Sequence, residues 1–203
     1  KYGCKAAAIQ CWNQLQSEIG IMPCAANALL NDKGIPVVCE TDKKLAALSY
    51  ELRAKTVDAI VGAGAGHIGG DMSVMDILVM LYFKHMNISP ENSEDPERDK
   101  FVMGKGHSVE SYYTVLAEKG FFPYEKYRDT FSRYGSEFIG HPHNILPGVE
   151  MNCGSLGHAL PVSVGMALAG KMDNADYRVY TVMGDGKLAE GSVWEGAMAP
   201  QGS

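Results

Sequence analysis

The chain has 203 residues, of which 46% are hydrophobic and 21% are charged, and this balance is typical of a globular protein with a sizeable core. Its formal net charge of −6, with no basic block, argues against a non-specific nucleic-acid binder. No apolar run approaches the roughly 18 residues of a membrane span, and five scattered cysteines without CxxC spacing indicate buried thiols in a reducing, cytoplasmic compartment.

From residue 43 onward the chain predicts helices that alternate with glycine turns and strands. Apolar residues including Leu45, Leu48 and Leu52 predict an amphipathic helix over 43–61. A glycine-rich loop at 62–70 follows, and Ser73 is predicted to cap the next helix. The remaining elements predicted are strands at 100–103 and 178–183, and helices at 108–119, 124–134 and 160–172. This alternation predicts an α/β fold with a parallel sheet flanked by helices.

The stretch from Tyr177 to Glu195, YRVYTVMGDGKLAEGSVWE, couples a predicted buried strand to a turn suited to phosphate and metal. Gly184 and Gly186 allow a tight turn and a close approach of the backbone to a diphosphate. Between them, Asp185 supplies a hard oxygen ligand for Mg²⁺ or Ca²⁺. GDG alone is also a common turn; the preceding strand and the following EGxxWE make the pattern much more specific.

Four of the six histidines directly follow a glycine, and three of these lie in the motifs GAGHIGG (His67), GKGH (His107) and GHPH (His141). A single histidine beside a glycine is usually structural or solvated. Three such residues indicate proton transfer on sugar hydroxyls, because imidazole titrates near neutral pH.

These motifs, together with FIGHPHNILPGVEMNCGSLGHALPVSVGMALAGK, resemble in order and spacing the N-terminal, thiamine-diphosphate-binding domain of transketolases over residues 43–199. The sequence of these motifs is most similar to the split bacterial form, in which this domain is a separate small protein chain. The resemblance implies transfer of two-carbon ketol units between sugar phosphates, as in pentose phosphate metabolism. Dehydrogenase-type thiamine enzymes and deoxyxylulose-phosphate synthase fit the histidine motifs less well.

The resemblance also implies roles for individual residues. His67 and His107 would lie near the reactive carbon of thiamine diphosphate and the oxygens of the donor sugar, and His141 would bind the donor's terminal hydroxyl. Asp185 would hold the metal, Mg²⁺ or Ca²⁺. The expected cofactor-binding residues are Gly154, Ser155, Leu156, Gly157, Gly184, Asp185, Gly186 and Glu190. Ser155 stands where proline is frequent in the family, and His158 stands where glutamine is frequent.

The resembled enzymes need groups that this sequence does not contain. Their aminopyrimidine-activating Glu comes from a second domain across a dimer interface, and an Asn beyond the GDG motif completes the metal shell. We therefore expect a chain truncated before that Asn and inactive alone. Its expected partner is a C-terminal transketolase subunit or domain, within a homo-oligomer or a heterotetramer.

Residues 1–42 resemble a different family, the L-fucose/L-arabinose isomerases, in which a carboxylate at the position of Asp42 binds metal, with Glu40 nearby. The chain also lacks an initiator Met, so it is expected to begin inside a reading frame. We predict two units, an isomerase-like fragment at 1–42 and a transketolase-like domain at 43–203, with early proteolysis near Lys43 and Lys44. A metal-dependent aldose–ketose isomerase and a non-enzymatic chimera are the alternative hypotheses.

Overall fold

The computed structural model of this protein describes residues 43–199. Its helices are α3 (Lys43–Ala63), α4 (Ile68–Met80), α5 (Val109–Lys119), α6 (Tyr124–Thr130), α7 (Ala159–Met172) and α8 (Gly191–Met198). Its strands are β1 (Lys100–Met103) and β2 (Val179–Val182). A π turn at Leu81–His85 extends α4, and short 3₁₀ turns cover Pro90–Asn92, Gly106–Ser108 and Asp185–Ala189.

The two strands pair in parallel, with Lys100 opposite Val179 and Met103 opposite Val182. The amide of Lys105 donates to the carbonyl of Val182 at 3.0 Å and continues the pairing past the end of β1. Both predicted strands are therefore confirmed, and within residues 43–199 they are neighbours. Their carboxyl ends meet at one edge of the sheet, which is where ligands bind in open α/β folds.

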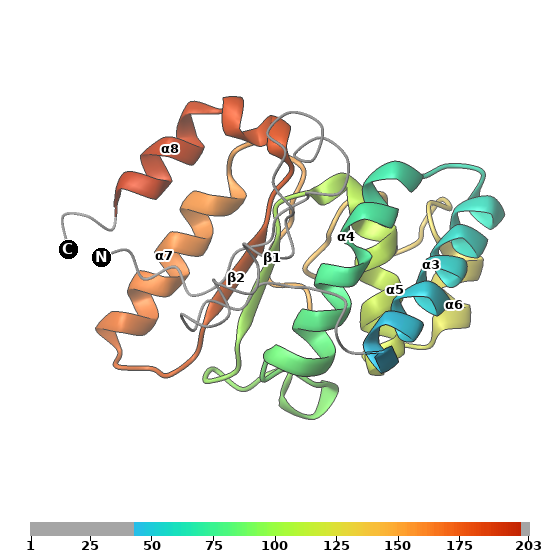
Figure 1. The fold of residues 1–203 in the computed structure, drawn as a ribbon, viewed down its shortest axis with the longest axis horizontal. Coiled ribbons are helices and arrows are strands. Elements are labelled where there is room, and N and C mark those ends of the chain that lie inside the picture. The colour runs from blue at the N-terminus through green and yellow to red at the C-terminus, as the bar shows by residue number, and fades with distance from the viewer. Residues whose placement is uncertain (1–42, 200–203) are drawn as a thin grey trace.

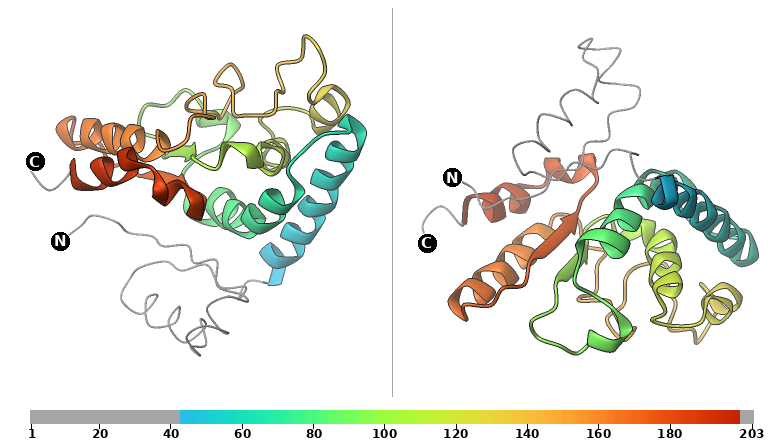
Figure 2. Two further views of the ribbon diagram at one scale, coloured as in Figure 1. Left: turned by 90° about the horizontal axis from the view of Figure 1, so that it is seen from above. Right: turned by 60° about the horizontal axis from the view of Figure 1, so that its bottom comes forward.

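The strands lie between two groups of helices (Figure 1). Helices α7 and α8 lie on one side, and α4, α5, α3 and α6 lie on the other. The two further views in Figure 2 show the same division, with the turn after β2 leading into α8. The predicted class of a helix-flanked parallel sheet is thus confirmed, in a molecule whose described part is mostly helical.

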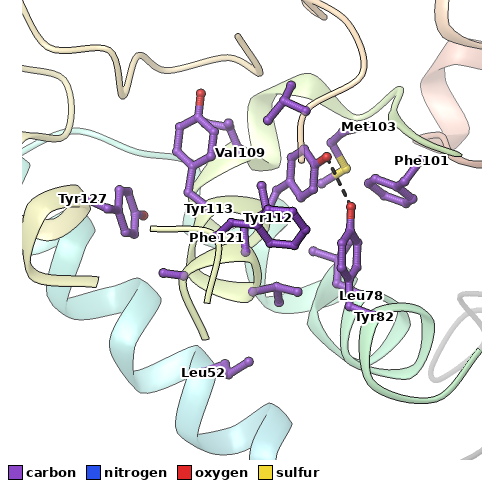
Figure 3. Packing of buried hydrophobic residues seen from close by; sticks show 14 of the residues in the cluster. Leu52, Leu78, Tyr82, Phe101, Met103, Val109, Tyr112, Tyr113, Phe121 and Tyr127 are labelled. Atoms are coloured by element: carbon purple, nitrogen blue, oxygen red, sulfur yellow. Dashed lines mark hydrogen bonds between the residues drawn. The ribbon is translucent and has the colours of Figure 1, made fainter. Parts of the chain in front are cut away.

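An aromatic core holds β1 to α4 and α5 (Figure 3). Tyr82, Phe101 and Tyr112 pack against one another with ring centroids 5.2–6.1 Å apart. The hydroxyls of the two tyrosines are 3.2 Å apart, and Tyr112 Oη donates to the carbonyl of Gly148 at 2.8 Å. Buried tyrosines are stable here because each hydroxyl has a partner.

The structure corrects several local predictions. Helix α4 begins at Ile68, so Ser73 lies inside it, where its hydroxyl bonds to the carbonyl of Gly70 instead of capping the helix. Helix α6 ends at Thr130, because Ser132 has a positive φ of 56° that a helix cannot continue through.

In residues 43–199 no helix has both the length and the apolar character needed to cross a membrane. The isomerase-like fragment at 1–42, with Asp42 and the predicted cleavage near Lys43, lies at or outside the boundary of the described residues.

Candidate functional site

Each strand ends in a glycine turn, and the two turns touch. A Cβ atom added to Gly104, directly after β1, would lie 2.8 Å from the Val182 carbonyl oxygen and 2.8 Å from Ala159 Cβ. No side chain fits in that space. Glycine at position 104 therefore lets the turn after β1 approach the end of β2 and the start of α7.

His67 and His107 lie together at this edge. Their ring centroids are 5.5 Å apart in an edge-to-face arrangement. Gly70 permits the approach, since a Cβ there would lie 2.5 Å from Ser108 Oγ and 3.2 Å from the His107 ring. The first turn of α4 thus packs directly on the 3₁₀ turn that precedes α5.

His141 joins them from the long connection between α6 and α7. Tyr113 on α5 donates its hydroxyl to the His141 carbonyl at 3.0 Å. A Cβ on Gly106 would lie 3.3 Å from His141 Cδ2, and one on Gly154 would lie 3.4 Å from the same atom. The three motif histidines and the loop at 154–157 therefore lie at one site.

The loop at 154–157 rests on the start of α8. Gly157 has a φ of +81°, and a Cβ at this position would collide with Ser192 Oγ and lie 2.8 Å from Glu190 Cβ. Ser155 and Leu156 are exposed, and Glu190 is half-buried at the residue before α8. His158 is exposed at the N-terminal boundary of α7.

Asp185 is exposed at the start of the turn after β2, with Gly184 and Gly186 on either side. A Cβ on Gly184 would lie 3.9 Å from Lys105 Cγ, and nothing lies within 4 Å of one on Gly186. Lys105 links this turn to α4, because its Nζ donates to the Gly70 carbonyl at 2.7 Å. Asp185 thus lies at the same edge of the sheet as His67 and His107.

Residues 44–200 match the family model described as transketolase, thiamine diphosphate binding domain. The chain belongs to the transketolase family.

The matched relatives include proteins named as single subunits of transketolases. The chain is 50% identical over 151 residues to one subunit of the apulose-4-phosphate transketolase of Phocaeicola vulgatus, a match that covers 74% of this chain and 53% of that protein. It is 43% identical over 148 residues to the 6-deoxy-6-sulfo-D-fructose transketolase subunit SqwG of a Clostridium species, covering 72% and 54%. The chain therefore spans about half the length of these curated relatives.

Solved structures show the same fold. The transketolase of Campylobacter jejuni superposes with a TM-score of 0.71 at 30% identity, over 75% of this chain and 25% of that chain. The transketolase from Leishmania mexicana gives 0.67 at 29% identity, over 75% and 24%. The predicted family and the predicted thiamine-diphosphate-binding fold are confirmed. Residues 1–42, which were predicted to be an isomerase-like fragment, lie outside the residues that the family model matches.

In this transketolase-family site, His107 and His141 are tuned toward the neutral form. Partial burial lowers the pKa of His107, and the nearby positive charges of Lys105 and Lys187 lower it further. Burial also lowers the pKa of His141, with smaller contributions from His67 and Lys187. Neutral imidazoles at pH 7 can accept protons from hydroxyl groups.

The described residues provide few ligands for a metal. No group of three or more His, Cys, Asp or Glu side chains in 43–199 is arranged to hold an ion. Asp185 is thus a single exposed carboxylate, and a cation bound there would need further oxygens, such as those of a diphosphate and water.

Three residues near the site were missed by sequence reasoning. Lys187 is only 6% exposed, and burial lowers its pKa. Asp71 and Glu110 are fully buried beneath His67. The sequence signal that could have found them is their position in the motifs. Lys187 directly follows GDG, Asp71 directly follows GHIGG, and Glu110 comes three residues after His107.

Proposed function

We propose that this chain is the thiamine-diphosphate-binding part of a transketolase that moves two-carbon ketol units between sugar phosphates. The observation that carries the proposal is the convergence of His67, His107 and His141 with the Gly184–Asp185–Gly186 turn at the carboxyl edge of two parallel strands. Proton-handling groups and an anion-binding turn then face the same space, as ketol transfer requires.

The residues around the GDG turn fit a diphosphate. Gly186 has open space where a side chain would otherwise stand, so the backbone can approach phosphate oxygens. The loop at Gly154–Gly157 and the N-terminus of α8, which begins at Gly191, lie against each other beside this turn. Backbone amides at a helix N-terminus favour an anion. Glu190, directly before α8, would help to hold the N-terminus of this helix in place.

Asp185 is proposed to hold the Mg²⁺ or Ca²⁺ that would accompany the diphosphate. Its carboxylate follows β2 directly and is exposed, so it is accessible to a cation. A divalent ion would offset the charge of the diphosphate and draw its remaining ligands from phosphate and water.

The histidines are proposed to act on the sugars. Thiamine diphosphate, when bound, serves as the electron sink for the carbon–carbon bond that breaks. His67 and His107 would orient the donor's oxygens and take up a proton from a hydroxyl group. His141, held through its carbonyl by Tyr113, would bind the donor's terminal hydroxyl.

Relatives named as transketolase subunits suggest the partner and the substrates. We propose a C-terminal transketolase subunit or domain as partner, in a homo-oligomer or heterotetramer. The sugars in the relatives' names carry a phosphate or a sulfo group, so an anionic ketose is the proposed donor class. A domain boundary at 42/43 is supported by the start of the family match at residue 44.

The metal assignment is testable by calorimetric titration of the chain with thiamine diphosphate and Mg²⁺, alone and together with a C-terminal transketolase subunit. We expect weak binding by the chain alone and tighter, Mg²⁺-dependent binding in the presence of that partner. Asp185→Asn should weaken that binding at least about tenfold, because it removes the charged metal ligand.

Asp176→Asn is the matched control, because Asp176 is exposed and precedes β2 at the opposite end of the same strand. Its affinity should equal that of the unmodified chain. Unchanged Mg²⁺-dependent affinity in Asp185→Asn would show that another group holds the metal. Absence of binding with the C-terminal partner would remove the cofactor proposal itself.

A further inference from the structure

Two carboxyl groups are enclosed beneath the histidines. Asp71 is in the first turn of α4 and Glu110 is in the first turn of α5, and they are 0% and 1% exposed. Ser111 holds Asp71 twice: its amide donates to Oδ1 at 2.8 Å, and its hydroxyl donates to the Asp71 carbonyl at 3.0 Å. The first turns of the two helices are therefore fixed to each other at this point.

Glu110 in turn contacts His67. The His67 amide donates to Glu110 Oε1 at 3.2 Å, and His67 Nδ1 is 3.8 Å from the same oxygen. A Cβ on Gly66 would lie 2.8 Å from Oε1, so only glycine allows this approach. The His67 side chain is 55% exposed, which leaves the rest of its ring open toward the site.

These contacts leave the second carboxyl oxygen of each acid without a hydrogen-bond partner within residues 43–199. Asp71 Oδ2 and Glu110 Oε2 are buried and have no hydrogen-bond partner among the described residues. The two acids are neighbours, because Ser111, whose amide binds Asp71 Oδ1, directly follows Glu110, and the charge of Glu110 is among the causes that raise the pKa of Asp71. Two adjacent buried carboxyl groups cannot both carry charge without a large penalty, whereas one proton between them satisfies both free oxygens.

We infer that Asp71 and Glu110 share one proton and that Glu110 acts as a positioning residue for His67. The negative charge at Glu110 Oε1 keeps the proton of the neutral imidazole on Nδ1. Nε2 is then the nitrogen with the free lone pair, available to accept a proton at the site. The tautomer of His67 is inferred from the position and charge of Glu110 beside Nδ1; its importance for ketol transfer rests on the proposed function.

The electrostatics agree with a shared proton. Burial raises the pKa of both acids, and it raises the pKa of Asp71 to about 7, with the charge of Glu110 as the next cause. The pair therefore releases its second proton near neutral pH. The other titratable groups that face the pair are His67, Lys105, Tyr113 and Tyr127.

The tautomer of His67 in the ligand-free chain tests the inference through long-range ¹H–¹⁵N spectra at about pH 8, where a solvated imidazole is neutral and carries its proton mostly on Nε2. We expect the unmodified chain to show Nδ1–H. Asp71→Asn should keep that form, because the amide can donate to Glu110 and leaves its charge in place. Glu110→Gln should change the majority form to Nε2–H, because the anion beside Nδ1 is gone.

A measurement on the unmodified chain covers the case in which a variant fails to fold. Side-chain ¹³C shifts of Asp71 should show a midpoint near pH 7. Ionisation of both acids below about pH 5, or an Nε2–H form of His67 in the unmodified chain, would overturn the inference. Neither spectrum requires thiamine diphosphate, so failure of the cofactor proposal would leave both results unchanged.

Discussion

The two groups of helices on either side of the strands pack against them to very different extents. Helix α5 buries nine of its 11 residues, whereas α7 buries three of 14. The strands follow the same division: Phe101, Val102 and Met103 of β1 are buried, and every residue of β2 is only half-buried. The side that contains α3 to α6 therefore supplies most of the core of the described protein, because buried apolar area is the main source of stability.

The candidate site lies where these two sides meet, and each side contributes a different kind of residue to it. The histidines belong to the well-packed side, through α4, α5 and the loop that Tyr113 holds. Asp185 and the 154–157 loop belong to the side with α7 and α8. The groups proposed for proton transfer therefore lie on the well-packed side, whereas the turns proposed to bind phosphate and metal lie on the side that buries fewer residues.

The largest expected difference between the two sides is in their contribution to the free energy of unfolding, and substitution of one leucine on each side tests it. Leu78 in α4 is fully buried, and Leu188 in the turn after β2 is 48% exposed. Leu78→Ala should lower the free energy of unfolding by about 2–5 kcal/mol through lost burial and a cavity. Leu188→Ala should change it by less than about 0.5 kcal/mol. Urea unfolding of both variants checks this; equal losses would show that the two sides are equally packed.

The contact between the two sides can be broken at Gly104. A Cβ there would lie 2.8 Å from Ala159 Cβ and from the Val182 carbonyl oxygen, so Gly104→Ala must push β1 and α7 apart. We expect a loss of about 1–3 kcal/mol, measured by thermal or urea unfolding. Weaker binding of thiamine diphosphate should accompany it, since the turns after both strands move.

Gly165→Ala is the matched control on α7. No atom lies within 4 Å of its added Cβ, and alanine favours a helix over glycine by up to about 1 kcal/mol. This variant should be equally or more stable than the unmodified chain. A stabilising Gly104→Ala would show that the turns can separate without cost.

Motif reasoning could predict the site's position because its signals are local. Glycine turns directly after strands fix where Asp185 and His107 lie once the strands are parallel neighbours, and periodicity predicted α3, α5 and α7 closely. The start of α4 was missed, because tertiary contacts of Gly70 with the Ser108 turn extend the helix through a glycine-rich segment. The burial of Asp71 and Glu110 could not be predicted, since it depends on two helices that meet far apart in sequence.

The smallest expected effect is a pH dependence that originates at this acid pair inside the well-packed side. Burial raises the pKa of Asp71 from 3.8 to about 7, so its contribution to stability is fully present below about pH 4 and is lost as pH rises through 7. His107 and His141, whose pKa values are lowered by burial, act in the opposite sense, because the unfolded chain binds more protons near pH 6.

Asp71→Asn separates these contributions, because the histidines are the same in both proteins. The unmodified chain should lose about 1–2 kcal/mol relative to Asp71→Asn between about pH 5.5 and pH 7, since its raised-pKa carboxyl becomes charged within that interval. Urea midpoints at matched pH values measure the difference. Asp176→Asn, at an exposed position before β2, should show no such slope. Parallel stability curves for the Asp71→Asn and unmodified chains would mean that Asp71 is already ionised at pH 5.5, and that the packed side tolerates two buried charges.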